Sequence, residues 1–492
     1  MRFALPVNID CSRLTTGDSR LAQLATASIL CSLIGVAWLK IDHLLIGPAL
    51  ALVPLAGLIV LKQPFPFALG FVLFSFFRLH EVFPQLYSLR IPQLLAMGTL
   101  VSLCWSLWSG RLTAYWTREL SIFGLFFLLV TVGLVFASNR GAAIGSFTGN
   151  YIKIAIMVVA IAWLATGIRQ LSHTARAIII CGILVGAVAL FNKMNGIGLV
   201  EGTRVTIGRN IGSMLGDPND LALVLLFPAG FALSYMLNRG MGWSTRILAA
   251  IGFVTVVCAV VATQSRGGLL GIAAVTGIFA YRRIKSKALL AAIGAVALMA
   301  LFAMAGVNDR ASGGAHEEGI DESAMGRIHA WGAAIRMALH NPLTGVGLDN
   351  FILNYWIYSD FWDGQNHAVH STWFGVLAET GVLGLVIFVS MMGIILRCVL
   401  LALGRLRAGG GLPEGRERWE AYALAEAVLA SLAGFTVSGT FLTMGFTWPI
   451  YILLALATAL GRLSSQMALA ASQTDLQSAP PTTTAPGVSK LN

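Results

Sequence analysis

The chain has 492 residues, of which 57% are hydrophobic and only 11% are charged. Charged residues make up about a quarter of a typical soluble domain, so this composition excludes a soluble globular protein. Apolar runs of about 17–25 residues recur along almost the whole length, and each is long enough to cross a bilayer as a helix. We therefore expect an all-α polytopic membrane protein with about 12–14 transmembrane helices.

The expected spans follow from the positions of the apolar runs. They lie near residues 21–39, 44–61, 65–79, 91–108, 120–137, 151–168, 176–192, 219–237, 246–262, 267–281, 288–306, 372–396, 424–441 and 447–461. This spacing predicts a transmembrane scaffold with two outer turns, one large periplasmic loop, a C-terminal set of transmembrane helices and a disordered cytoplasmic tail. The corresponding residues are 1–306, with the turns at 193–218 and 263–266, then 307–371, 372–463 and 464–492.

The net charge of +11 raises the question of a nucleic-acid partner. With the N-terminus in the cytoplasm, most lysines and arginines fall in the inner segments, as in the run Y-R-R-I-K-S-K at 281–287. This distribution follows the positive-inside rule, so the basic excess needs no nucleic acid, and the expected partner is the lipid bilayer. Both termini are then cytoplasmic. The six cysteines lie in or beside predicted spans and none falls in the long outer loops, so we expect no disulfide there, and their spacing is not that of metal ligands. No cofactor and no metal ion are expected.

Two outer turns carry arginines that topology does not explain. The glycine-rich stretch 193–218 contains Arg204 and Arg209, and its end, Asp217-Pro218, predicts a helix N-cap followed by proline at the first helical position. The stretch T-Q-S-R-G-G-L-L at 263–270 places Arg266 between two spans, and its glycines allow the backbone to approach a ligand closely. Ligand binding is favoured for Arg266, whereas for Arg209 a plain surface role stays equally open.

The large outer loop contains a predicted amphipathic helix that starts at Ser323. Its apolar positions share one helical face and are Met325, Ile328, Trp331, Ile335 and Leu339. Arg327 lies in the first turn, where the helix dipole disfavours a cation unless an anion is bound there. This position therefore makes Arg327 a candidate anion-binding residue.

His370 stands where the loop meets the span expected at 372–396. A helix N-terminus and nearby arginines disfavour an imidazolium, so the pKa of His370 should be lowered, and a neutral imidazole is what a general base requires. His367, one turn earlier, is a candidate partner. An interfacial histidine that merely caps a helix remains the alternative. Glu379 lies on roughly the opposite helical face, so we interpret it as a packing contact.

Several short motifs together resemble the O-antigen ligase and polymerase superfamily. They are D-P-N-D-L-A-L at 217–223, S-R-G-G at 265–268, G-R-I-H-A-W at 326–331, N-P-L-T-G-V-G at 341–347, and H-S-T-W-F-G-V-L-A-E-T-G-V-L-G at 370–384. The resemblance covers roughly residues 200–395 in motif detail and the whole chain in architecture. One departure stands at His370-Ser371, where the family often has His-Asn, although a serine can also cap the helix.

The resemblance implies a glycosyltransferase at the periplasmic face of the bacterial inner membrane. The donor would be a glycan on undecaprenyl diphosphate, and the acceptor of a ligase would be the lipid A–core oligosaccharide, giving mature lipopolysaccharide. The family's histidine maps onto His370 as general base, and its two arginines map onto Arg266 and Arg327. Arg209 is a further candidate for the diphosphate, and His367, Ser371 and Arg204 are candidate supporting residues.

The expected mechanism is inverting and independent of metal ions. Three arginines can neutralise a diphosphate without a cation, and the only close carboxylate pair of the loop, Asp360 and Asp363, lies in an aromatic run. Three other functions remain open. They are an O-antigen or exopolysaccharide polymerase, a ligase that glycosylates protein, and a transporter of a polyanion or lipid-linked glycan, which should show charged or broken helices near mid-bilayer.

Overall fold

The computed structural model describes residues 32, 57, 59–304, 322–362, 364–407 and 415–478. Residues 1–63 and 64–492 form two compact units, and the helices named here belong to the second. The spans expected at 21–39 and 44–61, the first part of the expected outer loop at 307–321 and the end of the tail lie outside the described residues, apart from a few isolated positions.

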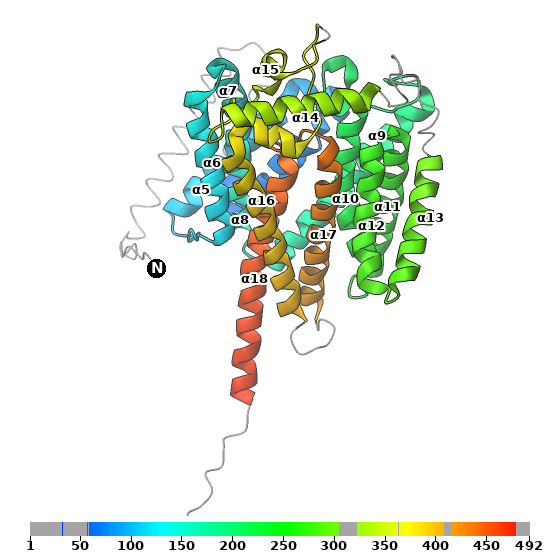
Figure 1. The fold of residues 1–492 in the computed structure, drawn as a ribbon. Coiled ribbons are helices and arrows are strands. Elements are labelled where there is room, and N and C mark those ends of the chain that lie inside the picture. Colours follow the sequence, from blue (N-terminus) through cyan, green and yellow to red (C-terminus); the bar gives the residue numbers. More distant parts are fainter. Residues whose placement is uncertain are drawn as a thin grey trace, which may run out of the picture. The chain divides into compact units, whose positions relative to one another are not determined.

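The first half of this unit consists of helices joined by short turns (Figure 1). In chain order they are α3 (Pro64–Phe76), α4 (Leu79–Val82), η2 (Pro84–Leu89), α5 (Ile91–Trp108), α6 (Arg118–Phe136), α7 (Arg140–Ser146), the π-turn η3 (Phe147–Tyr151), α8 (Ile152–Leu164), α9 (Ile168–Asn195), η4 (Arg209–Ile211), η5 (Met214–Gly216), α10 (Pro218–Leu237) and α11 (Trp243–Thr263).

The second half contains α12 (Arg266–Arg283), α13 (Lys287–Met304), α14 (Glu322–His340), α15 (Phe351–Tyr358), α16 (Thr372–Leu406), α17 (Arg416–Ser438), η7 (Gly439–Phe441) and α18 (Trp448–Ser478). Helix α18 thus continues past residue 463, so the tail expected to be disordered from 464 is helical through Ser478.

Nine helical stretches in the described residues are long and apolar enough to cross a membrane, so by the composition of its helices the chain is a multi-pass membrane protein. They comprise η2 with α5, α6, α7 with η3 and α8, α9, α10, α11, α16, α17 with η7, and α18 to Ala470. Helices α3 and α13 are shorter apolar helices. The expected all-α class is confirmed. In the interval between α13 and α16, α14 lies across the direction of the long helices, with α15 at the same end of the bundle (Figure 1).

Helices α10 and α17 form the buried centre of the bundle, because nearly all their residues are covered by other helices. They approach closely through small residues, as is usual in membranes where apolar burial alone gives no preference between lipid and protein. A Cβ on Gly230 would overlap Ser431 of α17. Ser431 Oγ donates to Phe227 O at 3.2 Å, and Ser234 Oγ donates to Ala423 O at 2.6 Å.

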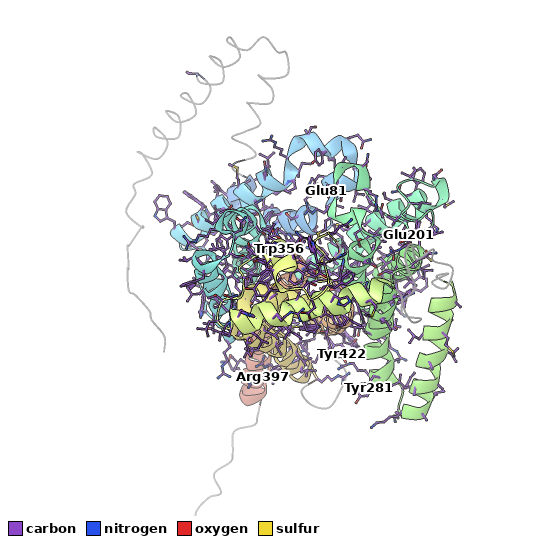
Figure 2. The ribbon with its side chains drawn as sticks, turned by 45° about the horizontal axis from the view of Figure 1, so that its top comes forward. Glu81, Glu201, Tyr281, Trp356, Arg397 and Tyr422 are labelled. Atoms are coloured by element: carbon purple, nitrogen blue, oxygen red, sulfur yellow. The ribbon has the colours of Figure 1, made fainter. Side chains whose placement is uncertain are left out.

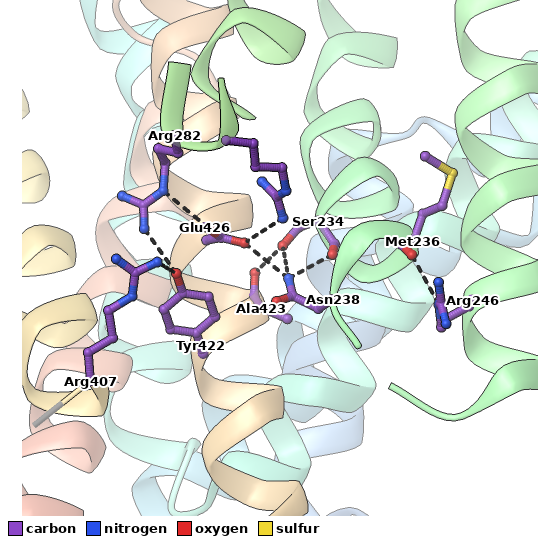
Figure 3. A network of polar contacts seen from close by, with 10 residues as sticks. Ser234, Met236, Asn238, Arg246, Arg282, Arg407, Tyr422, Ala423 and Glu426 are labelled. Carbon is purple, nitrogen blue, oxygen red and sulfur yellow. Dashed lines mark hydrogen bonds and ion pairs between the residues drawn. The ribbon is translucent and has the colours of Figure 1, made fainter. Parts of the chain in front are cut away.

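One end of this centre holds a network of arginines around a buried carboxylate (Figure 3). The side chain of Glu426 is only 3% exposed, and it accepts from Arg282 Nε at 3.2 Å and from Asn238 Nδ2 at 3.1 Å. Arg283 adds an ion pair at 3.6 Å. The basic run at 281–287 therefore does more than mark topology, since two of its arginines compensate a buried charge inside the bundle.

The opposite end of the bundle, here named the site end, holds the N-termini of α10, α12 and α16. In Figure 2 Trp356 of α15 lies over this end, with Glu201 of the 193–218 stretch on the same side, whereas Tyr281 and Tyr422 lie toward the arginine end. Of the three helices that begin at the site end, α12 starts at the candidate Arg266, α10 starts directly after the predicted cap Asp217, and α16 starts two residues after the candidate His370.

Candidate active site

The N-terminus of α12 carries Arg266 at its first residue. Gln264 adopts a left-handed conformation with φ 52°, which turns the chain so that Ser265 caps the helix by accepting from Gly268 N at 3.2 Å. Arg266 itself is exposed. Gly268 allows close helix packing at this point, because a Cβ there would lie 2.6 Å from the Cβ of Ala222 on α10.

Arg204 connects the 193–218 stretch to the end of α11 and the start of α10. Its guanidinium is buried, and it donates from Nε to Thr263 O at 3.2 Å and from Nη2 to Asn219 Oδ1 at 3.0 Å. Ser265 Oγ donates to the same Asn219 oxygen at 2.8 Å, so one amide joins the starts of α10 and α12. Burial lowers the pKa of Arg204, the charges of Glu201 and Asp217 oppose that shift, and the charge of Arg266 adds to it. Arg204 is thus an electrostatic neighbour of both Asp217 and Arg266.

Asp217 caps α10, as its place before Pro218 predicted. Its Oδ1 accepts from Asn219 N at 2.7 Å and from Asp220 N at 3.2 Å. Arg209, in η4, is exposed, and its Cα would lie 2.9 Å from a Cβ on Gly216. The sequence therefore brings Arg209 beside the start of α10 through a close backbone contact that only glycine allows at position 216.

His370 lies directly before the N-terminus of α16, with φ 44°. A left-handed histidine is uncommon, and such strained residues concentrate at functional sites. The residue is exposed, yet the protein around the imidazole displaces enough water to lower its pKa. The positive charge of Arg327 lowers the pKa further, Asp217 raises it, and His367 lowers it. The expected lowering of the pKa of His370 is confirmed. Its first cause is the loss of water around the imidazole, and the charge of Arg327 comes second.

The charge of Arg327 acts on His370 because α14 packs on the chain on either side of His370. Trp331 Nε1, one turn beyond Arg327, donates to Val369 O at 3.1 Å, and its ring stacks on Phe374 with centroids 5.0 Å apart. The buried face of α14 consists of alanines and a methionine, namely Ala330, Ala333, Ala334, Met337 and Ala338. The expected helix is present, and the apolar residues Ile328, Ile335 and Leu339 on its predicted apolar face are exposed rather than packed against other helices.

The connection between α17 and α18 holds the starts of α12 and α16 side by side. Thr372 Oγ1 donates to Leu442 O at 2.7 Å and accepts from Met444 N at 3.1 Å, while Trp373 Nε1 donates to Thr440 Oγ1 at 3.1 Å. A Cβ on Gly267 of α12 would lie 3.4 Å from Phe441. The N-termini of α10, α12 and α16 therefore meet at the site end, and their dipoles favour an anion there.

Ser371 does not act as the sequence suggested. It occupies the N-cap position of α16 and is fully buried, but its hydroxyl makes no capping hydrogen bond, and in the described part of the chain its Oγ has no hydrogen-bond partner. A serine here is therefore a small buried residue beside His370 rather than a helix cap. The unbonded helix N–H groups remain oriented toward the site end.

Other residues of the loop serve its packing. Asp360 forms an ion pair with Arg336, and Asp363 lies outside the described residues. His329 stacks on Phe361 with centroids 4.9 Å apart. The rings of His367 and of Tyr355 in α15 form a T-shaped pair with centroids 5.3 Å apart, and the charge of His367 acts on His370. Within the described ranges, no group of three His, Cys, Asp or Glu side chains has an arrangement that could hold a metal ion.

Glu379 is buried in α16, and its surroundings agree with the interpretation as a packing contact. Its Oε1 accepts from Phe351 N at 3.4 Å, at the start of α15. Two residues later Gly381 interrupts the helix with φ 72° and ψ −174°. Neither this break nor the charge interaction between Asp217 and His370 was predicted from the sequence, since a role as helix cap sufficiently explained Asp217. The glycine in E-T-G-V-L-G was the available signal for the break.

The comparisons with known proteins agree with this placement. Residues 251–389 match the family model described as O-antigen ligase, a stretch that begins in α11, ends in α16 and includes Arg266, Arg327 and His370. No curated protein matches the chain. The resemblance seen in the sequence motifs is confirmed over this stretch, and the chain therefore contains an O-antigen ligase domain over residues 251–389.

Proposed function

We propose that the protein is an O-antigen ligase that transfers a glycan from undecaprenyl diphosphate to the lipid A–core oligosaccharide, at the periplasmic face of the inner membrane. The observation that carries this proposal is the juxtaposition of His370 and Arg327 beside the joined N-termini of α10, α12 and α16, within a domain of the O-antigen ligase family. The site offers a neutral base and a concentration of positive charge, which are the two things this transfer requires.

The chemical step is a single displacement at the anomeric carbon of the donor. The oxygen of an acceptor hydroxyl forms the new bond to that carbon, and the bond between the carbon and the diphosphate oxygen breaks with inversion. The electron pair leaves with undecaprenyl diphosphate, and the hydroxyl proton passes to a nitrogen of His370. A lowered pKa keeps His370 neutral and ready to accept this proton.

Arg266 and Arg327, with Arg209 beside the start of α10, bind the diphosphate and stabilise the charge that it gains on leaving. Guanidinium groups bind phosphate through two parallel hydrogen bonds, so they combine charge with orientation and no metal ion takes part in the proposed step. Arg204 holds the starts of α10 and α12 together through Asn219 and so fixes the position of Arg266. The carboxylate of Asp217 stabilises the imidazolium that forms on His370.

Deletion of the gene, followed by gel analysis of lipopolysaccharide and of lipid-linked glycan, tests the proposal in the cell. Loss of a ligase leaves bare lipid A–core together with long lipid-linked chains, and the intact gene restores mature lipopolysaccharide. Loss of a polymerase would instead leave lipid A–core that carries single repeats. Unchanged lipopolysaccharide with altered glycosylation of protein would assign the acceptor to protein and overturn the proposed reaction.

A further inference from the structure

Helix α16 consists of two helices separated at Gly381, where φ 72° and ψ −174° are conformations that essentially only glycine adopts. The first piece, residues 372–380, begins two residues after His370, with Ser371 at the N-cap position. A helix break inside an apolar segment is costly unless other groups replace the missing hydrogen bonds, since the surroundings supply no water. The break therefore has to be filled by protein.

The turn 341–347, which follows α14, fills it. Pro342 O accepts from Val382 N at 2.8 Å and from Leu383 N at 3.4 Å, at the start of the second piece of α16. In return Val346 N donates to Ala378 O at 2.9 Å, and Gly347 N donates to Glu379 O at 3.2 Å. The backbone groups that the break releases on both sides are thus satisfied by one turn. A broken helix is one feature expected of a transporter, but this break is occupied by the protein itself.

The fit depends on glycines of both partners. A Cβ on Gly345, which has φ 64°, would overlap the backbone of residues 378–380, and a Cβ on Gly381 would overlap Pro342 O. Neither position can accept a side chain without separating the turn from α16. By contrast, a Cβ on Gly393, also in α16, or on Gly326, next to Arg327, would meet nothing within 4 Å.

This junction connects the two halves of the proposed active site. Arg327 stands on α14, whose C-terminal end leads directly into the turn 341–347, and His370 stands at the N-terminus of the 372–380 piece. Nearer to the site, the ring of Trp331 in α14 stacks on Phe374 of the 372–380 piece, and Trp331 Nε1 donates to Val369 O, one residue before His370. Helix α14 and the 372–380 piece are therefore fastened to each other at two points.

We propose that the turn 341–347, seated in the break at Gly381, is a positioning element that holds Arg327 at a fixed distance from His370. Gly345 and Gly381 are then positioning residues of the transfer reaction, although neither contacts a substrate. This inference rests on the proposed function for its catalytic consequence. Its structural part, the coupling of the turn to the surroundings of His370, stands independently.

The test compares Gly345→Ala and Gly381→Ala with Gly393→Ala and Gly326→Ala, all in the full chain reconstituted in lipid nanodiscs. Each variant replaces glycine by alanine, but only the first two force the turn out of the break. Because these two disturb the same contact, the effects of combining them should be smaller than the sum of the single effects. Pro342→Gly loosens the turn without a steric clash, so it replaces Gly345→Ala or Gly381→Ala in the comparison if either of these variants fails to fold.

The decisive readout is the pKa of His370, followed by NMR of histidine labelled with 13C at Cε1 and assigned with His370→Gln. The charged or titratable groups that face His370 are Arg327 on α14, Asp217 at the start of α10, and His367 in the same loop. If the turn withdraws, Arg327 recedes, and the pKa of His370 should rise by roughly half a pH unit. Gly393→Ala and Gly326→Ala should leave it unchanged.

Turnover gives the second readout. A misplacement of about 1 Å in a catalytic group can lower the rate about a hundredfold, so Gly345→Ala should lower kcat by about tenfold to a hundredfold. The acid limb of its pH–rate profile should follow the raised pKa. A purely structural role would reduce the folded fraction and leave both the limb and the NMR pKa in place, which would overturn the inference.

The two proposals fail in different ways. If wild-type protein transfers no glycan but the pKa of His370 rises in Gly345→Ala or Pro342→Gly, the positioning element stands and the proposed reaction falls. If wild-type protein transfers glycan and the folded variants keep both the pKa and kcat of wild type, the positioning element falls and the reaction stands.

Discussion

Two charges of opposite sign act on His370 from different helices, and removing each should move the activity in opposite directions along the pH axis. Arg327→Gln removes the positive charge that lowers the pKa of His370, so the pKa should rise. Asp217→Asn removes the negative charge that raises it, so the pKa should fall. Asparagine caps a helix as well as aspartate does, so the second change preserves the start of α10.

The size of these shifts follows from the surroundings of the imidazole. A unit charge roughly 6–8 Å away shifts a pKa by between about 0.4 unit in water and about 2 units inside a protein. His370 is exposed on one side, so solvent screening places the expected shift near the lower end, at about 0.5 unit. Because His370 acts only when neutral, the acid limb of kcat/KM should move up by that amount in Arg327→Gln and down in Asp217→Asn.

The assay is transfer from a synthetic polyprenyl-diphosphate glycan in nanodiscs, followed from about pH 4.5 to 8 so that the limb and the plateau are both defined. Arg327→Gln should also lower the plateau value of kcat/KM. The pH at which the acid limb falls does not depend on that plateau value. Arg336→Gln is the matched control, because it removes a positive charge from the same helix at a residue paired with Asp360. Shifts of both variants in one direction, or limbs that stay in place, would refute the role assigned to His370.

Three further outcomes are expected. Arg266→Lys and Arg327→Lys should each weaken donor binding and rate by about tenfold, measured by donor KM and kcat, because an ammonium cannot make the two-pronged contact of a guanidinium; rates equal to wild type would exclude these residues from diphosphate binding. Excess chelator should leave the turnover of purified protein unchanged, and turnover that is lost and then restored by magnesium or manganese would require a metal-dependent mechanism. Reporter fusions near residues 313 and 410 should be periplasmic and cytoplasmic, respectively, and the reverse labelling would place His370 on the wrong side of the membrane for this donor.

The sequence predicted the positions of the spanning helices well because the signals are local. The run expected at 219–237 is α10, Pro218–Leu237, and its start follows from Asp217 and Pro218 alone. The run expected at 246–262 is α11, Trp243–Thr263, in the same way. Length, hydropathy and caps are properties of one segment, so no knowledge of the neighbouring helices is needed.

Features that depend on distant segments could not be predicted in this way. The break at Gly381 persists because the turn 341–347 replaces its hydrogen bonds, and nothing within the segment itself specifies that turn. Helix α14 buries its alanines, whose small size permits close packing, while its larger apolar residues Ile328 and Leu339 stay exposed, so hydrophobicity alone did not identify the face that packs against protein.

The candidate site shows the same division. His370, Arg266 and Arg327 were candidates from their positions at helix ends and outer turns and from motifs that resemble one family, and the matched stretch includes all three. Asp217 was passed over because a helix cap accounts for an aspartate before a proline, and only the fold brings it to His370. The sequence thus pointed to candidate residues one by one, whereas their mutual arrangement required the three-dimensional contacts.

Reconstituted transfer by wild-type protein and by His370→Gln tests the central claim most directly. Both proteins would be given the same polyprenyl-diphosphate glycan and lipid A–core acceptor, with donor binding measured in parallel. The account predicts that His370→Gln binds donor nearly as wild type does but transfers glycan about a hundredfold to ten-thousandfold more slowly. A folded His370→Gln protein that transfers glycan at close to the wild-type rate would contradict it, and His367 would be the first alternative proton acceptor to examine.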